Sequence, residues 1–275
     1  MTVDLERGFS LALGGGGARG WAHIGVARAL EAAALAPSAV VGTSMGAVVG
    51  AGIALGYPAA RMEAVARRTP VYRLIGRRSR YALFDSRPVL ERMGAELGNP
   101  RLEDLPIPMA ITAYDLVTGE THAIRSGDLV EALVRSIAVP LFFAPTHDGD
   151  AVWCDAGPWE AVPVSVARAL WPDLAVVGVR VDAPKPSILG SPLGARLLRA
   201  LAGRIGPAGD ALTARRYLSL LAARWADPVH DEPADLLITP RLGLTSAWQF
   251  SRIGPMVERG ERDARMALRE VSVHG

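Results

Sequence analysis

The sequence predicts an α/β fold, a three-layer α/β/α domain with a mostly parallel central sheet. Two consecutive strand–turn–helix units occupy the first 60 residues, and a glycine-rich turn joins each strand to its helix. Half of the 275 residues are hydrophobic, which is enough for a sizeable core, and no linker rich in glycine, serine or proline divides the chain. We therefore expect one domain over residues 1–275, with its active site at the carboxyl ends of the strands.

The second of these units carries a serine in its turn. An apolar run at residues 39–41 is followed by Gly42-Thr43-Ser44-Met45-Gly46 and then by a helix of small residues over 47–55. A serine in so sharp a turn takes strained backbone angles, which present its Oγ at the N-terminus of the helix. Gly42 and Gly46 are expected on steric grounds, because a Cβ at either would collide where the strand end and the helix start crowd together. The alternative is a chance pattern in a chain with 29 glycines.

The first unit contains a run of four glycines. Residues 9–13 predict a strand, a tight loop follows, and residues 22–34 predict a helix whose apolar positions share one face. Amides without side chains at a helix N-terminus favour an anion. Gly15-x-Gly17-x-x-Gly20 also fits a dinucleotide-binding fingerprint, but Thr43-Ser44 stands where that site needs an acidic residue. The loop is better interpreted as an oxyanion hole for a carbonyl oxygen under attack by Ser44.

The base that would activate Ser44 has two kinds of candidate. Among the histidines, His230 fits the Ser-Asp-His order of hydrolases with this turn, whereas His23 is expected to pack or cap the first helix. Asp155 is the better candidate, because it ends an apolar strand at residues 151–154 and small residues follow it. Burial would raise the basicity of its carboxylate. The alternative for Asp155 is a turn or cap aspartate ahead of a helix. The remaining histidines are His122, His147 and His274.

Three motifs in this order resemble those of the patatin-like phospholipases, a family of lipid acyl hydrolases. They are Gly15-Gly16-Gly17-Ala18-Arg19-Gly20, Gly42-Thr43-Ser44-Met45-Gly46 and Asp155-Ala156-Gly157. The likeness is strong over residues 9–57, moderate over 105–182 and 235–270, and poor over 58–104 and 183–234. The two poor stretches are expected to be variable, as lids or membrane contacts. Two departures are Ala156, where the family usually has glycine, and Glu160-Ala161 in place of Asn-Pro.

The resemblance implies a role for each motif. Ser44 would be the nucleophile and Asp155 its base, Gly15, Gly16 and Gly17 would form the oxyanion hole, and Arg19 would stabilise the loop or bind a lipid phosphate. A solvated arginine at a helix start is the alternative for Arg19. The implied reaction is hydrolysis of lipid acyl esters through an acyl-serine, with no cofactor and no metal. Acyl transfer by the same dyad is one alternative, and a catalytically weak lipid-binding or regulatory protein is another.

Charge and cysteine content say less about partners. The net charge is only +2, but five arginines near interfacial aromatics suit an anionic lipid surface: Arg67, Arg68, Arg73, Arg77 and Arg78. An ordinary solvated face is the alternative. One cysteine, Cys154, and an N-terminus of mixed charge favour the cytoplasm, with peripheral contact at the inner membrane face. The nearly uncharged stretch 39–60 is too rich in glycine for a membrane span and belongs in a core. No pattern indicates nucleic-acid binding or an oligomeric state.

Overall fold

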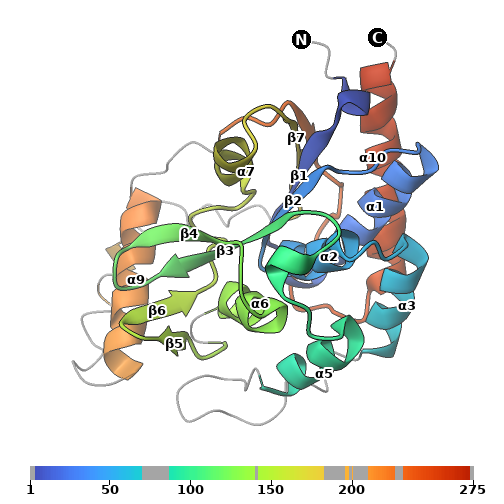
Figure 1. The fold of residues 1–275 in the computed structure, drawn as a ribbon. Helices are drawn as coiled ribbons and strands as arrows, with labels where there is room; N and C mark the ends of the chain where they lie inside the picture. The colour runs from blue at the N-terminus through green and yellow to red at the C-terminus, as the bar shows by residue number, and fades with distance from the viewer. Residues whose placement is uncertain are drawn as a thin grey trace.

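The protein, a computed structural model, has the predicted α/β architecture, with a central sheet that is mostly parallel and carries helices on both faces (Figure 1). The structure describes residues 4–69, 87–139, 142–182, 196–197, 200, 210–226 and 232–272. The strands are β1 (Phe9–Leu13), β2 (Ala39–Thr43), β3 (Met109–Asp115), β4 (Glu120–Ile124), β5 (Thr146–Asp148), β6 (Ala151–Cys154), β7 (Ala175–Val179) and β8 (Leu236–Ile238). The helices are α1 (Ala22–Ala32), α2 (Met45–Ala54), α3 (Ala59–Arg68), α5 (Arg87–Leu97), α6 (Leu129–Ile137), α7 (Val164–Leu170), α9 (Asp210–Ala226) and α10 (Ile253–Ser272), with short 3-10 turns η1 (Leu5–Arg7), η2 (Gly17–Trp21) and η3 (Leu102–Asp104).

The sheet has a parallel part and an antiparallel part. The strand order in the described residues is β5-β6-β3-β2-β1-β7-β8, with β4 paired to β3 outside this path. β1 lies parallel to β2 and β7, while β3 is parallel to β2 but antiparallel to β4 and β6. Parallel strands place their carboxyl ends at one edge, so the turns after β1 and β2 lie side by side there.

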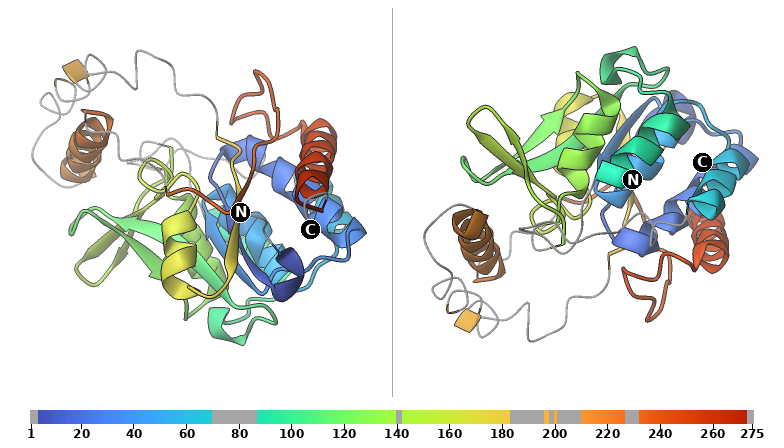
Figure 2. Two further views of the ribbon diagram at one scale, coloured as in Figure 1. Left: turned by 90° about the horizontal axis from the view of Figure 1, so that it is seen from above. Right: turned by 90° about the horizontal axis from the view of Figure 1, so that it is seen from below.

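Successive side chains of the parallel strands point to opposite faces of the sheet, which explains why helices pack on both faces. Leu11 and Leu13 of β1 belong to the larger apolar core with α1, α2 and α10, whereas Ala12 between them packs with α7 on the other face. Because successive side chains of a strand point to opposite faces, a strand buried on both faces reads as a continuous apolar run. Figure 2 shows the helices separated in this way on either side of the sheet.

The described helices within the stretches of poor resemblance also pack on this framework. Leu218 and Leu221 of α9 lie in an apolar cluster with Tyr114 and Leu116 at the end of β3. The Arg216 guanidinium donates to the Leu116 carbonyl at 3.0 Å. Among helices in the described ranges, none combines the length and apolar character that crossing a bilayer requires. The stretch 39–60 contributes β2 and the buried helix α2 to the core, as predicted.

Candidate active site

Ser44 sits at the sharp turn between β2 and α2. Its φ of 54° and ψ of −123° place a non-glycine residue in a strained region of backbone space. A Cβ on Gly46 would lie 2.2 Å from the Leu13 carbonyl oxygen, and one on Gly42 would lie 2.4 Å from the Ala47 Cα. The crowding expected from the sequence is therefore present. Glycine at both flanking positions allows the strained turn at Ser44 to form, because no side chain would fit at either of them.

The C-terminal turn of α6 holds Ser44 from outside the motif. The Ser44 N–H donates to the Ser136 Oγ at 2.8 Å, and Ser136 is fully buried. No role for Ser136 was predicted from the sequence. The available signal was its position on the apolar face of an amphipathic helix, three residues after Leu133 and seven after Leu129, where a hydroxyl needs a hydrogen-bond partner.

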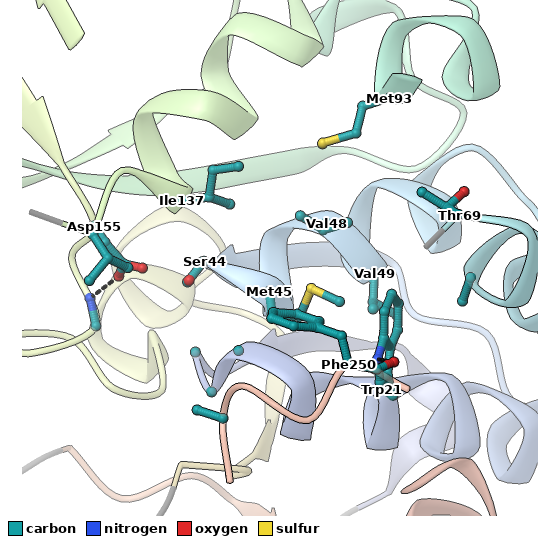
Figure 3. A pocket seen from close by; sticks show the side chains of 18 of the residues that line it. Trp21, Ser44, Met45, Val48, Val49, Thr69, Met93, Ile137, Asp155 and Phe250 are labelled. Atoms are coloured by element: carbon teal, nitrogen blue, oxygen red, sulfur yellow. Dashed lines mark hydrogen bonds between the residues drawn. The ribbon is translucent and has the colours of Figure 1, made fainter. Parts of the chain in front are cut away.

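Asp155 follows β6 and faces Ser44. In Figure 3 the two side chains point toward each other at one end of a cavity. The Asp155 N–H donates to the Ala138 carbonyl at 3.0 Å, and the Gly157 N–H donates to Asp155 Oδ1 at 2.7 Å. Burial raises the pKa of the Asp155 carboxyl to about 6, while hydrogen bonds from the Ser44 hydroxyl and the Gly157 amide act to lower it. A carboxylate with this pKa is a stronger base than an exposed aspartate.

The glycine loop after β1 supplies two amides beside Ser44. Gly16 and Gly17 both line the same cavity as Ser44, and no acceptor among the described residues takes the N–H of either. The expectation for Gly15 needs correction, because its N–H donates to the Ala161 carbonyl at 3.1 Å. That amide anchors the loop to the segment after Asp155 and is not free to bind an oxyanion.

Arg19 stabilises the loop from within the protein. Its side chain is buried, and it donates to the carbonyls of Val181 (2.6 Å), Gly243 (3.0 Å) and Thr245 (2.9 Å). Burial lowers the pKa of the guanidinium from its ordinary value, an effect that the nearby Asp182 carboxylate opposes. The alternative of a solvated arginine is wrong. A loop-stabilising role, one of the two that the resemblance implied, agrees with these bonds.

The cavity extends from this group of polar atoms into an apolar interior. Its volume is about 440 Å³. Figure 3 places Ser44 and Asp155 at one side, Met93 and Thr69 at the other, and Val48 and Met45 between them. The apolar side chains of the lining come from η2, α1, α2, α3, α5, the end of α6 and the loop before α10: Trp21, Ile24, Met45, Val48, Val49, Met62, Val65, Met93, Leu97, Ile137 and Phe250.

The comparisons with known proteins identify the family of the chain. The family model described as "Patatin-like phospholipase" matches residues 11–168, more than half of the chain. The chain belongs to the patatin-like phospholipase family. An uncharacterized NTE family protein of Mycobacterium tuberculosis is 33% identical over 170 residues, which cover 61% of this chain and 47% of that protein. Lysophospholipase NTE1 of Mycosarcoma maydis is 30% identical over 172 residues, 58% of this chain and 9% of the relative.

The patatin-like chain spans about half the length of the mycobacterial relative and a much smaller share of the fungal one. In the crystal structure of VipD from Legionella pneumophila, the similarity covers 96% of this chain and 67% of the other, with a TM-score of 0.58 and 12% identity. At that identity the likeness concerns the fold alone.

The departures from the usual patatin-like motif leave the backbone at Asp155 ordinary. In the described part of the chain, positive φ angles at non-glycine residues occur at Ala34, Ser44 and Asn99, so Ala156 does not adopt one. Its methyl group is fully buried in the cluster that contains Tyr114 and Cys154. Glu160, the second departure, accepts a hydrogen bond from the Ser165 hydroxyl at 2.8 Å. With both changes present, the Ser44 hydroxyl still hydrogen-bonds the Asp155 carboxylate.

The histidines that the structure describes lie away from the cavity lining of this patatin-like site. His23 is fully buried with its Nε2 2.8 Å from the Gly14 carbonyl, which fits the predicted packing role. Burial lowers the pKa of His23 to about 4, so the ring is neutral near pH 7. His122 packs edge-on against Trp153, and His147 lies in β5. His230 and His274 fall outside the described residues.

The arginine cluster is described only in part. Arg67 forms an ion pair with Glu63 on the same helix, at 2.5 Å, and Glu63 also bonds Arg28. Arg68 is exposed at the end of α3. The other three, Arg73, Arg77 and Arg78, lie outside the described residues. Within the described ranges, no group of three or more histidine, cysteine or acidic side chains is arranged to hold a metal ion.

Proposed function

We propose that this protein hydrolyses acyl esters of lipids, with Ser44 as the nucleophile and Asp155 as the general base. The observation that supports the proposal is the meeting of four groups at one end of an apolar cavity: the Ser44 hydroxyl, the Asp155 carboxylate and the amides of Gly16 and Gly17. A nucleophile, a base and oxyanion donors around one point are the parts that acyl transfer needs.

The proposed reaction has two halves. The Ser44 Oγ attacks the ester carbonyl carbon while its proton passes to Asp155, and the Gly16 and Gly17 amides donate to the negative oxygen that develops. The tetrahedral intermediate then collapses, the alcohol leaves with the proton from Asp155, and an acyl-Ser44 ester remains. In the second half Asp155 takes a proton from water, the resulting hydroxide attacks the acyl carbon, and the carboxylic acid is released as Ser44 regains its proton.

The cavity indicates the acyl part of the substrate. A volume of about 440 Å³ is within the usual range for small-molecule sites, and the lining beyond Ser44 is dominated by apolar side chains such as Val48, Met93 and Phe250. An acyl chain gains free energy by leaving water for such a lining, whereas a charged head group would lose its hydration there. We therefore assign the interior to the acyl chain and the Ser44 end to the ester bond.

The decisive experiment combines active-site labelling with lipid hydrolysis. A fluorophosphonate probe should label the wild type and leave Ser44→Ala unlabelled, and hydrolysis across a panel of phospholipids and lysophospholipids should be lost with the same substitution. Asp155→Asn should lower turnover by about 10² to 10⁴-fold, the usual contribution of a general base. Ser10→Ala is the matched control, because Ser10 is also a buried serine but lies within β1, outside the cavity lining.

Two results would overturn the proposal: labelling that persists in Ser44→Ala, or near-normal turnover in Asp155→Asn. An unlabelled wild type that still binds lipid would favour the binding-protein alternative. Added short-chain alcohol separates hydrolysis from transfer, since a transferase would convert the acyl group into a new ester at the expense of the free acid.

A further inference from the structure

The loop between β8 and α10 displays two large apolar side chains to solvent beside the cavity. Leu244 is fully exposed, at 105% of its reference area, and Trp248 is 47% exposed. Trp248 also lines the cavity that contains Ser44, so this ring borders both the site and the solvent. Both views in Figure 2 show the orange-red loop that leads into α10 projecting from the body of the molecule.

This exposure belongs to a loop that is held firmly in place. The Arg19 guanidinium donates to the carbonyls of Gly243 and Thr245, the two residues that flank Leu244. Nearer Trp248, the Ala18 N–H donates to the Ala247 carbonyl at 2.7 Å, and the Trp21 indole N–H donates to the Phe250 carbonyl at 3.2 Å. These bonds fix the backbone on both sides of each exposed side chain, so burial within the loop itself is prevented.

We propose that Leu244 and Trp248 insert into the surface of a lipid bilayer or micelle and thereby set the cavity mouth against it. Apolar side chains on a fixed, projecting loop are unfavourable in water and mark an interaction site. Tryptophan is well suited to the interface, because its ring is apolar and its indole N–H is polar. The choice of a lipid partner rests on the proposed function, since the adjoining cavity is the one assigned to a lipid acyl chain.

Two further features favour lipid over a protein partner. The apolar tip of the loop consists of two exposed side chains, whereas a stable protein interface usually buries about 1,200 Å² or more in total. A lipid surface deforms around such a tip. Arg252, at the end of the same loop, and Arg68, at the end of α3, are exposed cations, and Arg67 of α3 lies next to Gly254 at the start of α10. Exposed guanidinium groups near this loop would bind lipid phosphates if the inserted tip brings them to the head groups.

The test measures partition into phosphatidylcholine vesicles by cosedimentation, in the Ser44→Ala background so that catalysis plays no part. Leu244→Asp should weaken partition roughly tenfold or more, because the free energy gained by moving one leucine side chain out of water would be lost. Val117→Asp is the matched control, because Val117 is 53% exposed but lies in the turn between β3 and β4, outside this loop and outside the cavity lining. Leu244→Phe should retain binding, and equal thermal unfolding midpoints of the variants should exclude misfolding.

Two further readouts separate insertion from other forms of contact. Binding should persist in about 0.5 M salt, because apolar insertion is not screened, whereas docking through arginines alone would be lost. Brominated lipids should quench a component of the tryptophan fluorescence that is missing in Trp248→Phe. Wild-type protein that does not partition, or equal partition of the Leu244→Asp and Val117→Asp variants, would overturn the inference. So would self-association that Leu244→Asp abolishes, since that result identifies a second copy of the chain as the partner.

Because binding is measured without turnover, this inference can fail while esterase activity is intact. The proposed function can equally fail while binding is observed.

Discussion

The two halves of the site are built in different ways. Ser44 owes its geometry mainly to neighbours in sequence, since Gly42 and Gly46 permit the turn and the amides of Ala47 and Val48 bond the Ser44 carbonyl. Asp155 instead depends on the end of α6, whose Ala138 carbonyl accepts the Asp155 N–H. Local steric constraints can be predicted from adjacent residues in the sequence. The position of an acid that is held by another element can be known only from the whole fold.

The largest effect is expected from adding a side chain to a glycine in the turn that holds Ser44. Gly46→Val would place a Cβ 2.2 Å from the Leu13 carbonyl oxygen. Since backbone cannot yield there, we expect a loss of about 3 kcal/mol in the free energy of unfolding, together with loss of fluorophosphonate labelling. Denaturant titration of each variant measures the stability.

Gly94→Ala is the control for that comparison. Gly94 lies within α5, and a Cβ added to it would have no heavy atom of another part of the chain within 4 Å. Alanine there should be neutral or stabilising by up to about 1 kcal/mol. Equal stability of Gly46→Val and the wild type would show that the crowding around Ser44 is not a constraint on the fold.

On the acid side, the burial that makes Asp155 a stronger base should also lower the stability of the fold. Burial raises the folded-state pKa of Asp155 from an ordinary 3.8 to about 6, so the unfolded chain releases this proton first as the pH rises. The free energy of unfolding therefore falls by roughly 3 kcal/mol as the pH rises from 3.8 to about 6. It stays at this lower value at higher pH. Asp155→Asn keeps an acceptor for Gly157 and removes that cost.

We accordingly expect Asp155→Asn to be more stable than the wild type at pH 7 and about equal to it below pH 4, although it is nearly inactive. Denaturant titrations at the two pH values measure the difference. The wild-type kcat/KM should also fall as the pH drops through about 6, where Asp155 becomes protonated. A variant that is less stable than the wild type at both pH values would contradict the linkage.

The same contrast explains what the sequence could and could not predict. The strand at 9–13, the apolar run at 39–41 within β2, the turn at Ser44 and the strand before Asp155 could all be predicted, because apolar runs and glycine spacing are local signals. The role of Ser136, the engagement of the Gly15 amide by Ala161 and the burial of Arg19 were not, because each depends on segments that are distant in the chain. The glycine motif was predicted to be a tight loop, whereas its second half belongs to the 3-10 turn Gly17–Trp21. Which of its amides remain free to donate could not be predicted without the fold.

Ser136→Ala should give an intermediate effect, because it removes the link between the two halves. The buried Ser44 N–H would lose its acceptor at 2.8 Å, which we expect to cost about 1 to 3 kcal/mol in unfolding free energy. Ser136 acts through Ser44 and is a positioning residue, so kcat should fall roughly tenfold while the pH midpoint of kcat/KM stays unchanged. Ser136→Thr, which keeps the oxygen, should recover part of the loss. Unchanged kcat in Ser136→Ala would mean that the turn holds Ser44 without this bond.

The smallest effect is expected at Ala156, where the chain departs from the family's usual glycine. The backbone of Ala156 lies outside the left-handed region, so the conformational freedom of glycine is not needed there. Its methyl group is fully buried, so its removal would lose packing contacts. We expect Ala156→Gly to lower the unfolding free energy by about 1 kcal/mol and to change kcat less than about twofold. The measurement is a denaturant titration paired with steady-state kinetics. A rise in kcat of tenfold or more would mean that the methyl group tilts the acid, and the acid side would then be as sensitive to its neighbours in sequence as the nucleophile side is.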